Sequence, residues 1–243
     1  MITKAQIKFV KSLHLKKNRL THQLFLVQGK KNIIELLNSS LSIEALYVTD
    51  SFAQEISSHE ANYELVSQKE IEQMSSLKTN DAGIALVIIP SNAYLEASND
   101  WVFVLDEVKD PGNLGTIARI ADWYGVDKII CSNDSVDFYN PKVINASMGA
   151  FTRVDVYYTD LQNYFKNKNN LVFGAFLKGE SVYDVKAPKE AYLLMGNESN
   201  GISDDLVEFV NHKVSIPRLG GAESLNVAIA TAVICDNLIG RQF

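Results

Sequence analysis

Cysteine is scarce in this sequence of 243 residues. The two that occur, Cys131 and Cys235, stand far apart, and each lies inside an apolar run. They cannot form a disulfide framework or a CxxC metal pair, so we expect two buried thiols. The four histidines are also dispersed, without the spacing of metal ligands. These residue types exclude a disulfide-stabilised fold and predict no metal site.

Long apolar runs are missing too. No stretch reaches the length of about eighteen apolar residues that a membrane helix needs. The basic N-terminus lacks the apolar centre and the small-residue cleavage site of a secretory signal. With 47% hydrophobic and 21% charged residues, the composition is typical of a soluble protein of one or two domains. We therefore expect a cytoplasmic protein.

Several familiar motifs are absent. The chain has no GxGxxG after a strand, no GxxxxGK[ST] and no GxSxG. The first two cradle the phosphates of dinucleotides and of ATP, and the third carries the nucleophile of many hydrolases. These absences argue against a nicotinamide enzyme, a phosphate-binding-loop ATPase and a serine hydrolase of that type.

Acidic residues are absent from the first 31 positions, although the whole chain carries a net charge of −6. This segment has a formal charge of +8, which leaves −14 for the other 212 residues. A helix would place Lys4, Lys8 and Lys11 along one side. Two interpretations stay open, a solvated helix face or an arm that binds RNA phosphates. The residues predicted to bind RNA are Lys4, Lys8, Lys11, Lys16, Lys17 and Arg19.

Alternating strand and helix patterns divide the chain near residues 90–100. Before this point, strands are predicted at 23–28, 43–48, 63–67 and 83–89, with short helices at 30–38, 51–57 and 68–74. This alternation predicts a small α/β domain over residues 1–95. The stretch 90–100 contains Pro, Asn, Ser and Asp without periodicity, which is typical of a linker.

The second part, 100–243, repeats the alternation on a larger scale. Its first strand, 101–105, is wholly apolar, as in a sheet covered on both faces. Further strands are predicted at 127–131, 153–158, 171–176, 191–195 and 212–216. Helices are predicted near 113–125, 141–150, 160–168, 203–210 and 224–240. The fold class is therefore α/β.

Three passages from a strand into a loop are more than simple connections. They read LDEVKDPGNLGTIARIADWYG (105–125), LLMGNESNGIS (193–203) and IPRLGGAESLNVAIATAVICDNLIGRQF (216–243). Asn113 and Ser224 are each placed to cap a helix. Gly196 and Gly201 bracket Glu198, which predicts a positive φ or a close backbone approach. Each passage alone also has a purely structural interpretation.

Together and in this order, the three passages resemble the signature motifs of the SpoU or TrmH family of RNA 2′-O-ribose methyltransferases, within the SPOUT superfamily. NASMGAFTRVDV (145–156) is similar to the family's region between the first two motifs. The resemblance covers roughly 100–243. It extends more weakly to FLVQGKKNIIELL (25–37), which is similar to a small substrate-binding domain with a ribosomal-protein-like RNA-binding fold.

This resemblance implies a C-terminal parallel-sheet domain with a deep trefoil knot, an exception to the rule against knotted chains. It also implies a homodimer whose active site takes residues from both subunits, and S-adenosylmethionine as the cofactor. Adenine would be held by backbone groups and apolar side chains of the second and third motifs. The matching positions are Leu194, Gly196, Ile216, Leu225 and Asn226.

The resemblance also assigns the catalytic positions, which are Asn113, Arg119, Glu198, Ser224 and Asn226. A guanidinium keeps its proton at neutral pH, so Arg119 is better suited to holding an RNA phosphate than to acting as a base. The other residues would orient the ribose, the arginine and the cofactor, and Glu198 is also a candidate proton acceptor. Many members have NPxN where this chain reads DPGN (110–113), and Asp110 can still cap or turn the chain.

The RNA substrate remains open between alternatives. Large-subunit ribosomal RNA is favoured by the separate N-terminal domain, and transfer RNA is the second possibility. A non-catalytic RNA-binding homologue would keep the fold without the reaction, yet the polar motif residues are intact. A SPOUT enzyme that methylates a base is the lesser alternative.

Overall fold

The computed structural model describes residues 2–242, which form two compact units. The first unit extends to Ser91 and also contains Asp137–Arg153, whereas the second contains Asn92–Val136 and the chain from Val154 onward. No helix in the described part of the chain combines the length and the apolar character needed to span a bilayer.

The first unit is built on a four-stranded sheet with the order β1-β4-β2-β3. Its strands are β1 (Leu24–Gln28), β2 (Ile43–Val48), β3 (Glu64–Leu65) and β4 (Gly83–Ile88). β4 runs antiparallel to both neighbours, and β2 runs parallel to β3. Its helices are α1 (Lys4–Ser12), α2 (Lys16–His22), α3 (Lys30–Leu37), α4 (Asp50–Glu55), α5 (Gln68–Met74) and α7 (Pro141–Ser147), followed by the short η1 (Ala150–Thr152).

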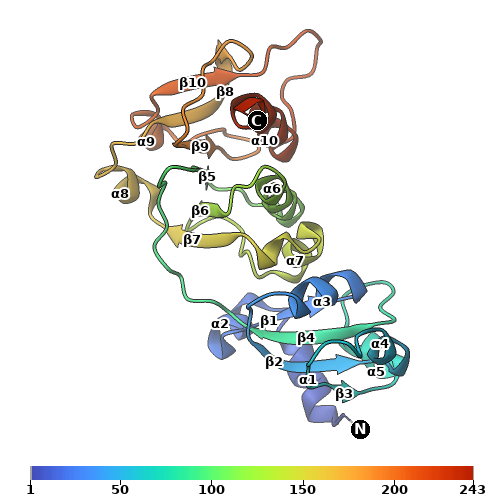
Figure 1. Ribbon diagram of the computed structural model, residues 1–243. Helices are drawn as coiled ribbons and strands as arrows, with labels where there is room; N and C mark the ends of the chain where they lie inside the picture. The colour runs from blue at the N-terminus through green and yellow to red at the C-terminus, as the bar shows by residue number, and fades with distance from the viewer. Residues whose placement is uncertain (1, 243) are drawn as a thin grey trace. The chain divides into compact units, whose positions relative to one another are not determined.

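The basic N-terminal segment is anchored by its apolar side. Val10 and Leu13 are fully buried and pack with Ile71 and Met74 of α5 against one face of the sheet. α3 contacts β1 and β4 and lies on the other face (Figure 1). A capping box at Thr3 satisfies free backbone N–H groups where α1 begins.

The segment 137–153 packs into the first unit, which the predicted boundary near 90–100 did not anticipate. Its Tyr139 and Phe151 rings both contact the ring of Phe25 on β1, with centroid distances of 4.8 and 6.2 Å. Asp137 forms a 2.6 Å ion pair with Arg19 of α2. A segment far from β1 in the sequence therefore completes the core beside that strand.

The second unit contains a six-stranded sheet with the order β10-β8-β9-β5-β6-β7. The strands are β5 (Trp101–Leu105), β6 (Lys128–Ser132), β7 (Asp155–Thr159), β8 (Val172–Ser181), β9 (Ala191–Met195) and β10 (His212–Ser215). Every neighbouring pair is parallel. The prediction of a parallel α/β sheet is therefore confirmed.

Helices cover both faces of this sheet (Figure 1). α6 (Pro111–Trp123) and α10 (Val227–Leu238) contact each other on one face, whereas α8 (Leu161–Phe165) and α9 (Asp204–Val207) lie on the other. The last turn is η2 (Gly240–Gln242). Because the central strands β5 and β9 are wholly buried, their side chains serve packing, and chemistry falls to the loops at their carboxyl ends.

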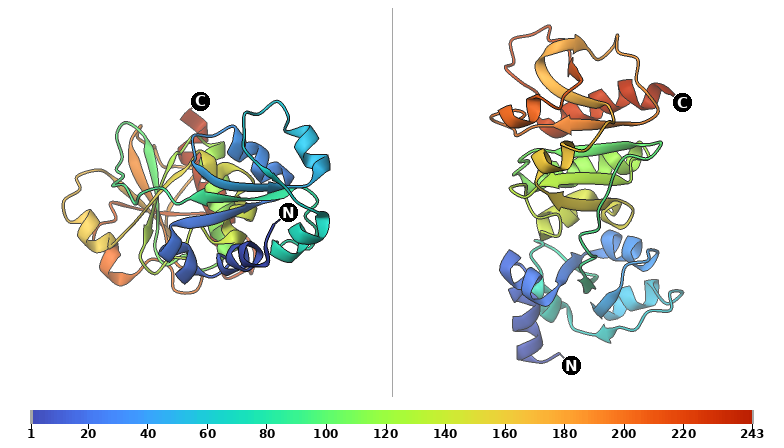
Figure 2. Two further views of the ribbon diagram at one scale, coloured as in Figure 1. Left: turned by 90° about the horizontal axis from the view of Figure 1, so that it is seen from below. Right: turned by 90° about the vertical axis from the view of Figure 1, so that its left-hand side faces the viewer.

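The segment before β5 is fixed to the second unit and runs along one side of it (Figure 2). The Asn92 side chain exchanges two hydrogen bonds with the backbone of Tyr158 on the edge strand β7. Further along, the Tyr164 hydroxyl donates to the carbonyl of Leu95, and the backbone N–H of Ala97 donates to the Tyr192 hydroxyl. Most of the predicted linker is therefore held in place.

Candidate active site

The first motif turns from β5 into α6, and Asp110 caps the helix. Its Oδ1 accepts a 2.8 Å hydrogen bond from the backbone N–H of Asn113, and Pro111 occupies the first helical turn. The prediction that Asn113 caps this helix is therefore wrong, because the helix begins two residues earlier. The expectation that Asp110 can cap the chain here is confirmed. Since Asn113 does not cap the helix, its side-chain amide is available for other hydrogen bonds.

The second motif is a tight turn after β9, and both of its glycines are required. A Cβ on Gly196 would lie 2.1 Å from the carbonyl carbon of Gly201, so the chain folds closely over this position. Gly201 itself has a φ of +73°, a conformation that favours glycine. The prediction of a positive φ or a close backbone approach at these glycines is confirmed, because Gly201 has the first and Gly196 the second. This turn presents Glu198 to solvent.

The third motif leads into α10, which is capped by Asn226. Its Oδ1 accepts hydrogen bonds of 3.0 and 3.3 Å from the backbone N–H groups of Ala228 and Ile229. The predicted cap at Ser224 is wrong, because the helix begins at Val227. Ser224 is exposed and makes no hydrogen bond within residues 2–242. Its predicted catalytic role stays a prediction.

A chain of side-chain hydrogen bonds joins the three motifs. Nδ2 of Asn226 donates to Oδ1 of Asn113 at 2.9 Å, and Nδ2 of Asn113 donates to Oε1 of Glu198 at 2.9 Å. The orientation of both amides follows from this chain, because Oδ1 of Asn226 is already occupied by the N–H groups of α10. Of the predicted catalytic residues, these three are brought together.

Glu198 keeps acceptor capacity for a substrate. Its Oε1 accepts from the Asn113 amide and, at 3.4 Å, from the backbone N–H of Asp110. No hydrogen bond to Oε2 is present within the described residues. The backbone N–H of Asp110 at the N-terminus of α6 points to this carboxylate, in keeping with the attraction between a helix N-terminus and a negative charge. The arrangement can hold a carboxylate in one orientation and offer its free oxygen to a hydroxyl group.

Arg119 lies apart from this chain of bonds. It follows Asn113 by six residues on α6, which places it about 120° away around the helix. Its side chain is exposed and has no hydrogen bond or ion pair within the part of the chain described. A single chain therefore does not bring the arginine to Glu198, and its predicted role is untested.

The segment 216–225 has the chemistry expected of an adenosine site. Within the described residues, no backbone-to-backbone hydrogen bond involves this segment. Ile216 is half-buried, Leu225 is 49% exposed and Leu219 is fully exposed. Apart from the carbonyl of Ala222, which accepts from the Arg218 guanidinium, these backbone groups have no hydrogen bond within the described residues. Such groups beside apolar side chains suit a ligand whose base is held by both. Leu194 differs, because its side chain is fully buried in the sheet core and leaves only its backbone for contact.

A family model described as the SpoU rRNA Methylase family matches residues 100–236, more than half of the chain. The chain belongs to this family. The match includes the three motif segments, from the Asp110 turn to the start of α10. The motifs that define the site therefore lie on the SpoU domain.

Several relatives of this SpoU-family chain match it over nearly its full length. The 23S rRNA (guanosine(2553)-2′-O)-methyltransferase RlmP of Bacillus subtilis is 29% identical, covering 97% of this chain and 96% of the relative. A solved TrmH-family protein from Porphyromonas gingivalis is 34% identical, with a TM-score of 0.91 and 99% of each chain covered. The SpoU methyltransferase AviRb from Streptomyces viridochromogenes, solved with the cofactor AdoMet, has a TM-score of 0.87 over 99% of this chain and 98% of its own. At 21% identity, this last likeness shows the fold alone.

The N-terminal part of the SpoU-family chain matches a second model, described as an MRM3-like substrate binding domain, over residues 4–85. The predicted RNA-binding lysines of this part are all exposed and have no ion pair within residues 2–242; they are Lys4, Lys8, Lys11, Lys16 and Lys17. The prediction for Arg19 is wrong. Its side chain is 2% exposed and is committed to Asp137, so its guanidinium is not available to a phosphate.

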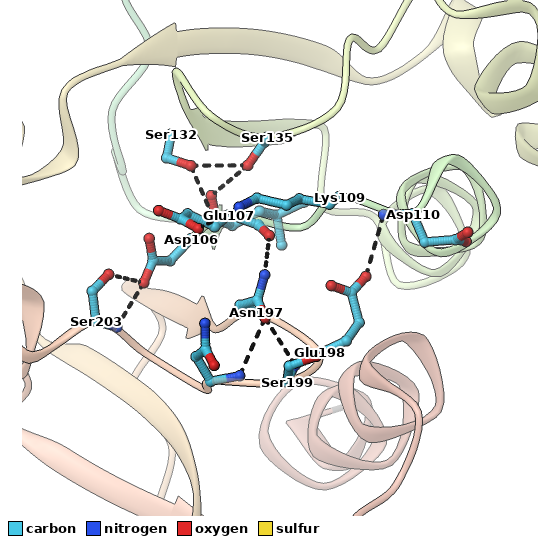
Figure 3. Close-up of polar contacts among 12 residues, drawn as sticks. Asp106, Glu107, Lys109, Asp110, Ser132, Ser135, Asn197, Glu198, Ser199 and Ser203 are labelled. Atoms are coloured by element: carbon cyan, nitrogen blue, oxygen red, sulfur yellow. Dashed lines mark hydrogen bonds and ion pairs between the residues drawn. The ribbon is translucent and has the colours of Figure 1, made fainter.

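Sequence reasoning missed a set of polar residues beneath the motif loops of the SpoU domain (Figure 3). The buried Asp106 accepts hydrogen bonds from the backbone N–H and the hydroxyl of Ser203, the residue that precedes α9. A charged residue directly after the apolar strand β5 was the signal available in the sequence. Nearby, Lys109 pairs with Glu107 at 2.8 Å, and the hydrogen bond and charge of that carboxylate raise the pKa of Lys109.

Proposed function

We propose that this protein transfers a methyl group from S-adenosylmethionine to a ribose 2′-hydroxyl of large-subunit ribosomal RNA. The observation that carries the proposal is the hydrogen-bonded chain from Asn226 through Asn113 to Glu198, which joins the three motif segments at one edge of the sheet. The full-length similarity to a 2′-O-methyltransferase of 23S rRNA supports the reaction and the class of RNA.

The residues would divide the work of binding and chemistry. The backbone of 216–225 and of Gly196, with the side chains of Ile216 and Leu225, would hold the cofactor. S-adenosylmethionine supplies an electrophilic methyl group, so the protein has to align the ribose oxygen and make it more nucleophilic. The free oxygen of Glu198 accepts a hydrogen bond from the ribose hydroxyl, and Asn113 keeps that carboxylate oriented. Arg119 holds the neighbouring phosphate in a bidentate contact.

A complete site is proposed to need a second copy of the chain. In one chain Arg119 is exposed and lies away from Glu198. The helix pair α6 and α10 also exposes large apolar side chains, with Trp123 at 84% and Ile229 at 53%. Because such residues are typical of buried interfaces, a homodimer formed through this surface would cover them and deliver Arg119 to the partner's site.

Membership of the SpoU family and the strand order of the second sheet support a trefoil knot in the chain after β9. The match to a substrate-binding domain supports RNA binding by residues 1–95, with methyl transfer by 100–243. The exposed lysines of α1 and α2 would contact phosphates there. A ribosomal RNA substrate would place the enzyme in the cytoplasm.

The reaction is tested with the full chain, labelled S-adenosylmethionine and ribosomal RNA from a strain lacking the gene. Methylated RNA is then hydrolysed in alkali and analysed by mass spectrometry. A 2′-O-methyl group blocks cleavage at its nucleotide, so the label should appear in an alkali-resistant dinucleotide. Label in a mononucleotide would indicate base methylation and overturn the proposal. Label on transfer RNA alone would overturn the choice of substrate.

A further inference from the structure

We propose that Asn197 is a positioning residue for methyl transfer, an inference that rests on the proposed function. Asn197 directly precedes Glu198 and uses both ends of its amide. Its Oδ1 accepts hydrogen bonds from the backbone N–H groups of Ser199 at 2.8 Å and Asn200 at 3.2 Å. Its Nδ2 donates a 2.8 Å hydrogen bond to the carbonyl of Glu107 (Figure 3). One side chain therefore shapes the second-motif turn and ties it to the first-motif loop.

The partner residue, Glu107, has a backbone conformation that needs such support. Its φ is +53°, in the left-handed region that residues with a Cβ rarely adopt. A conformation of this kind persists where the surrounding structure holds it. Asn197 holds the carbonyl of Glu107, and Oγ of Ser132 accepts a 2.8 Å hydrogen bond from its N–H.

Ser132, which accepts from the N–H of Glu107, is itself held by a hydrogen bond to Ser135. Ser135 donates its hydroxyl hydrogen to the carbonyl of Leu105 at 3.3 Å, so the 3.0 Å hydrogen bond between the two serines is donated by Ser132. Ser132, the last residue of β6, and Asn197, which follows β9, therefore fix both peptide groups around Glu107. Three residues later, Asp110 caps α6 and sets the position of Asn113.

Two hydrogen bonds thus connect the first-motif loop to the second-motif turn, and they differ in their exposure to water. The bond between Asn113 and Glu198 is exposed to water, whereas the bond between Asn197 and Glu107 is partly buried. Water competes for the exposed bond, so its net contribution is small. The partly buried tie beneath it keeps Glu198 within reach of Asn113, and therefore aligned with the ribose.

Only an amide performs both tasks at once. An aspartate in place of Asn197 would still accept from the N–H groups of Ser199 and Asn200, which preserves the turn. It has no hydrogen to donate to the carbonyl of Glu107 at neutral pH. Asn197→Asp therefore removes the tie and keeps the turn, whereas Asn197→Ala removes both.

The test compares Asn197→Asp, Asn197→Ala and the matched control Ser199→Ala, which keeps the N–H that Asn197 accepts. We measure kcat with saturating RNA and S-adenosylmethionine, Kd for the cofactor, Tm, and amide hydrogen exchange. Asn197→Asp should lower kcat by about tenfold or more, because small misplacements of reacting groups are costly. Its Tm and cofactor Kd should stay close to those of the parent. Exchange should accelerate at residues 106–110, on the far side of the tie. Ser199→Ala should resemble the parent.

The outcomes separate three cases. An Asn197→Asp variant with a kcat within about twofold of the parent and unchanged exchange at 106–110 overturns the inference. A fall in kcat that only follows a fall in folded fraction also overturns it, in favour of a purely structural residue. If the parent chain itself methylates no RNA, the proposed function fails, and the exchange data still decide whether Asn197 holds the first-motif loop.

Discussion

Asn226 and Asn113 are 113 residues apart in the chain, and the amide of Asn226 donates a 2.9 Å hydrogen bond to the amide oxygen of Asn113. This bond connects the N-terminus of α10 to the first turn of α6. It also forces Nδ2 of Asn113 toward Glu198. The capping role of Asn226 and the orientation of Glu198 are therefore coupled through one intermediate residue.

This coupling predicts that substitutions of Asn226 separate stability from activity. Aspartate is as good a cap as asparagine, so Asn226→Asp should keep the Tm, whereas Asn226→Ala should cost about 1 kcal/mol. Aspartate cannot donate to Asn113, and a compensating flip of Asn113 would break its bond to Glu198. Asn226→Asp should therefore lose at least about tenfold in kcat. Thermal melts and methyl-transfer rates on the same samples check this, and a fully active Asp variant would contradict it.

Substitution of Arg119 should lower turnover and leave stability nearly unchanged, unlike substitution of an arginine that supports the fold. Its side chain is exposed and makes no bond within residues 2–242, so Arg119→Ala should change stability by no more than about 0.5 kcal/mol. If it holds an RNA phosphate, the Ala variant should lose turnover and keep cofactor affinity. Lysine lacks the planar fork, so Arg119→Lys should recover only part of the rate. A stable Ala variant with near-normal turnover would refute the assignment.

The regular elements were predictable because burial imposes a pattern on the sequence. The strands 43–48, 101–105 and 191–195 were predicted with the bounds that the structure has. Helix starts were less accurate where several polar residues compete. Asp110 precedes Asn113, and Ser224 precedes Asn226, and each of these side chains can cap a helix. Which of the two caps the helix depends on the tertiary fold, which sets the residue where the chain enters the helix.

The site residues that belong to a motif could be predicted from the sequence. The features that depend on contacts with distant parts of the chain could not. Asn113, Glu198 and Asn226 were named from the motif resemblance. The left-handed conformation of Glu107 was not predicted, because among the residue types glycine is the one that indicates such a conformation in a sequence. Arg19 was predicted to bind RNA because it lies in the basic N-terminal segment. Its actual partner, Asp137, is 118 positions away in the sequence and could not be recognised from it. Long-range partners of this kind leave no local pattern.

The exposed lysines of α1 should control the salt dependence of RNA binding. Replacing Lys4, Lys8 and Lys11 with Gln should weaken binding and flatten its salt slope, by about 0.7 to 0.9 for each phosphate that is no longer neutralised. Cofactor affinity should not change. Filter binding across a range of salt concentrations checks this. A matched control with the same charge change replaces the exposed Lys178, Lys186 and Lys189 of the second unit. Equal slopes for both variants would favour a solvated helix face.

The buried thiols should make the protein less stable in alkali. Burial raises the pKa of Cys131 from 9.0 to about 12, and burial also raises the pKa of Cys235. Above the ordinary thiol pKa the unfolded chain loses protons that the folded chain retains, so stability falls as the pH rises from 9.0 toward 12. Urea unfolding at increasing pH should show a shallower fall for Cys131→Ala than for the parent. Parallel curves would contradict the burial of this thiol.

Arg19 should matter for folding and not for the salt dependence of RNA binding. Its guanidinium donates to Oδ2 of Asp137 and to the carbonyls of Leu13 and His14. Arg19→Ala would strand a nearly buried carboxylate, a loss of about 3 to 5 kcal/mol in unfolding free energy. Adding Asp137→Asn should recover part of that loss, because an uncharged amide is less costly to bury than a carboxylate. The exposed Lys17→Ala is the control and should change stability by about 0.5 kcal/mol or less. If urea unfolding gives similar midpoints for Arg19→Ala and Lys17→Ala, the ion pair does not stabilise the first unit, and this prediction is wrong.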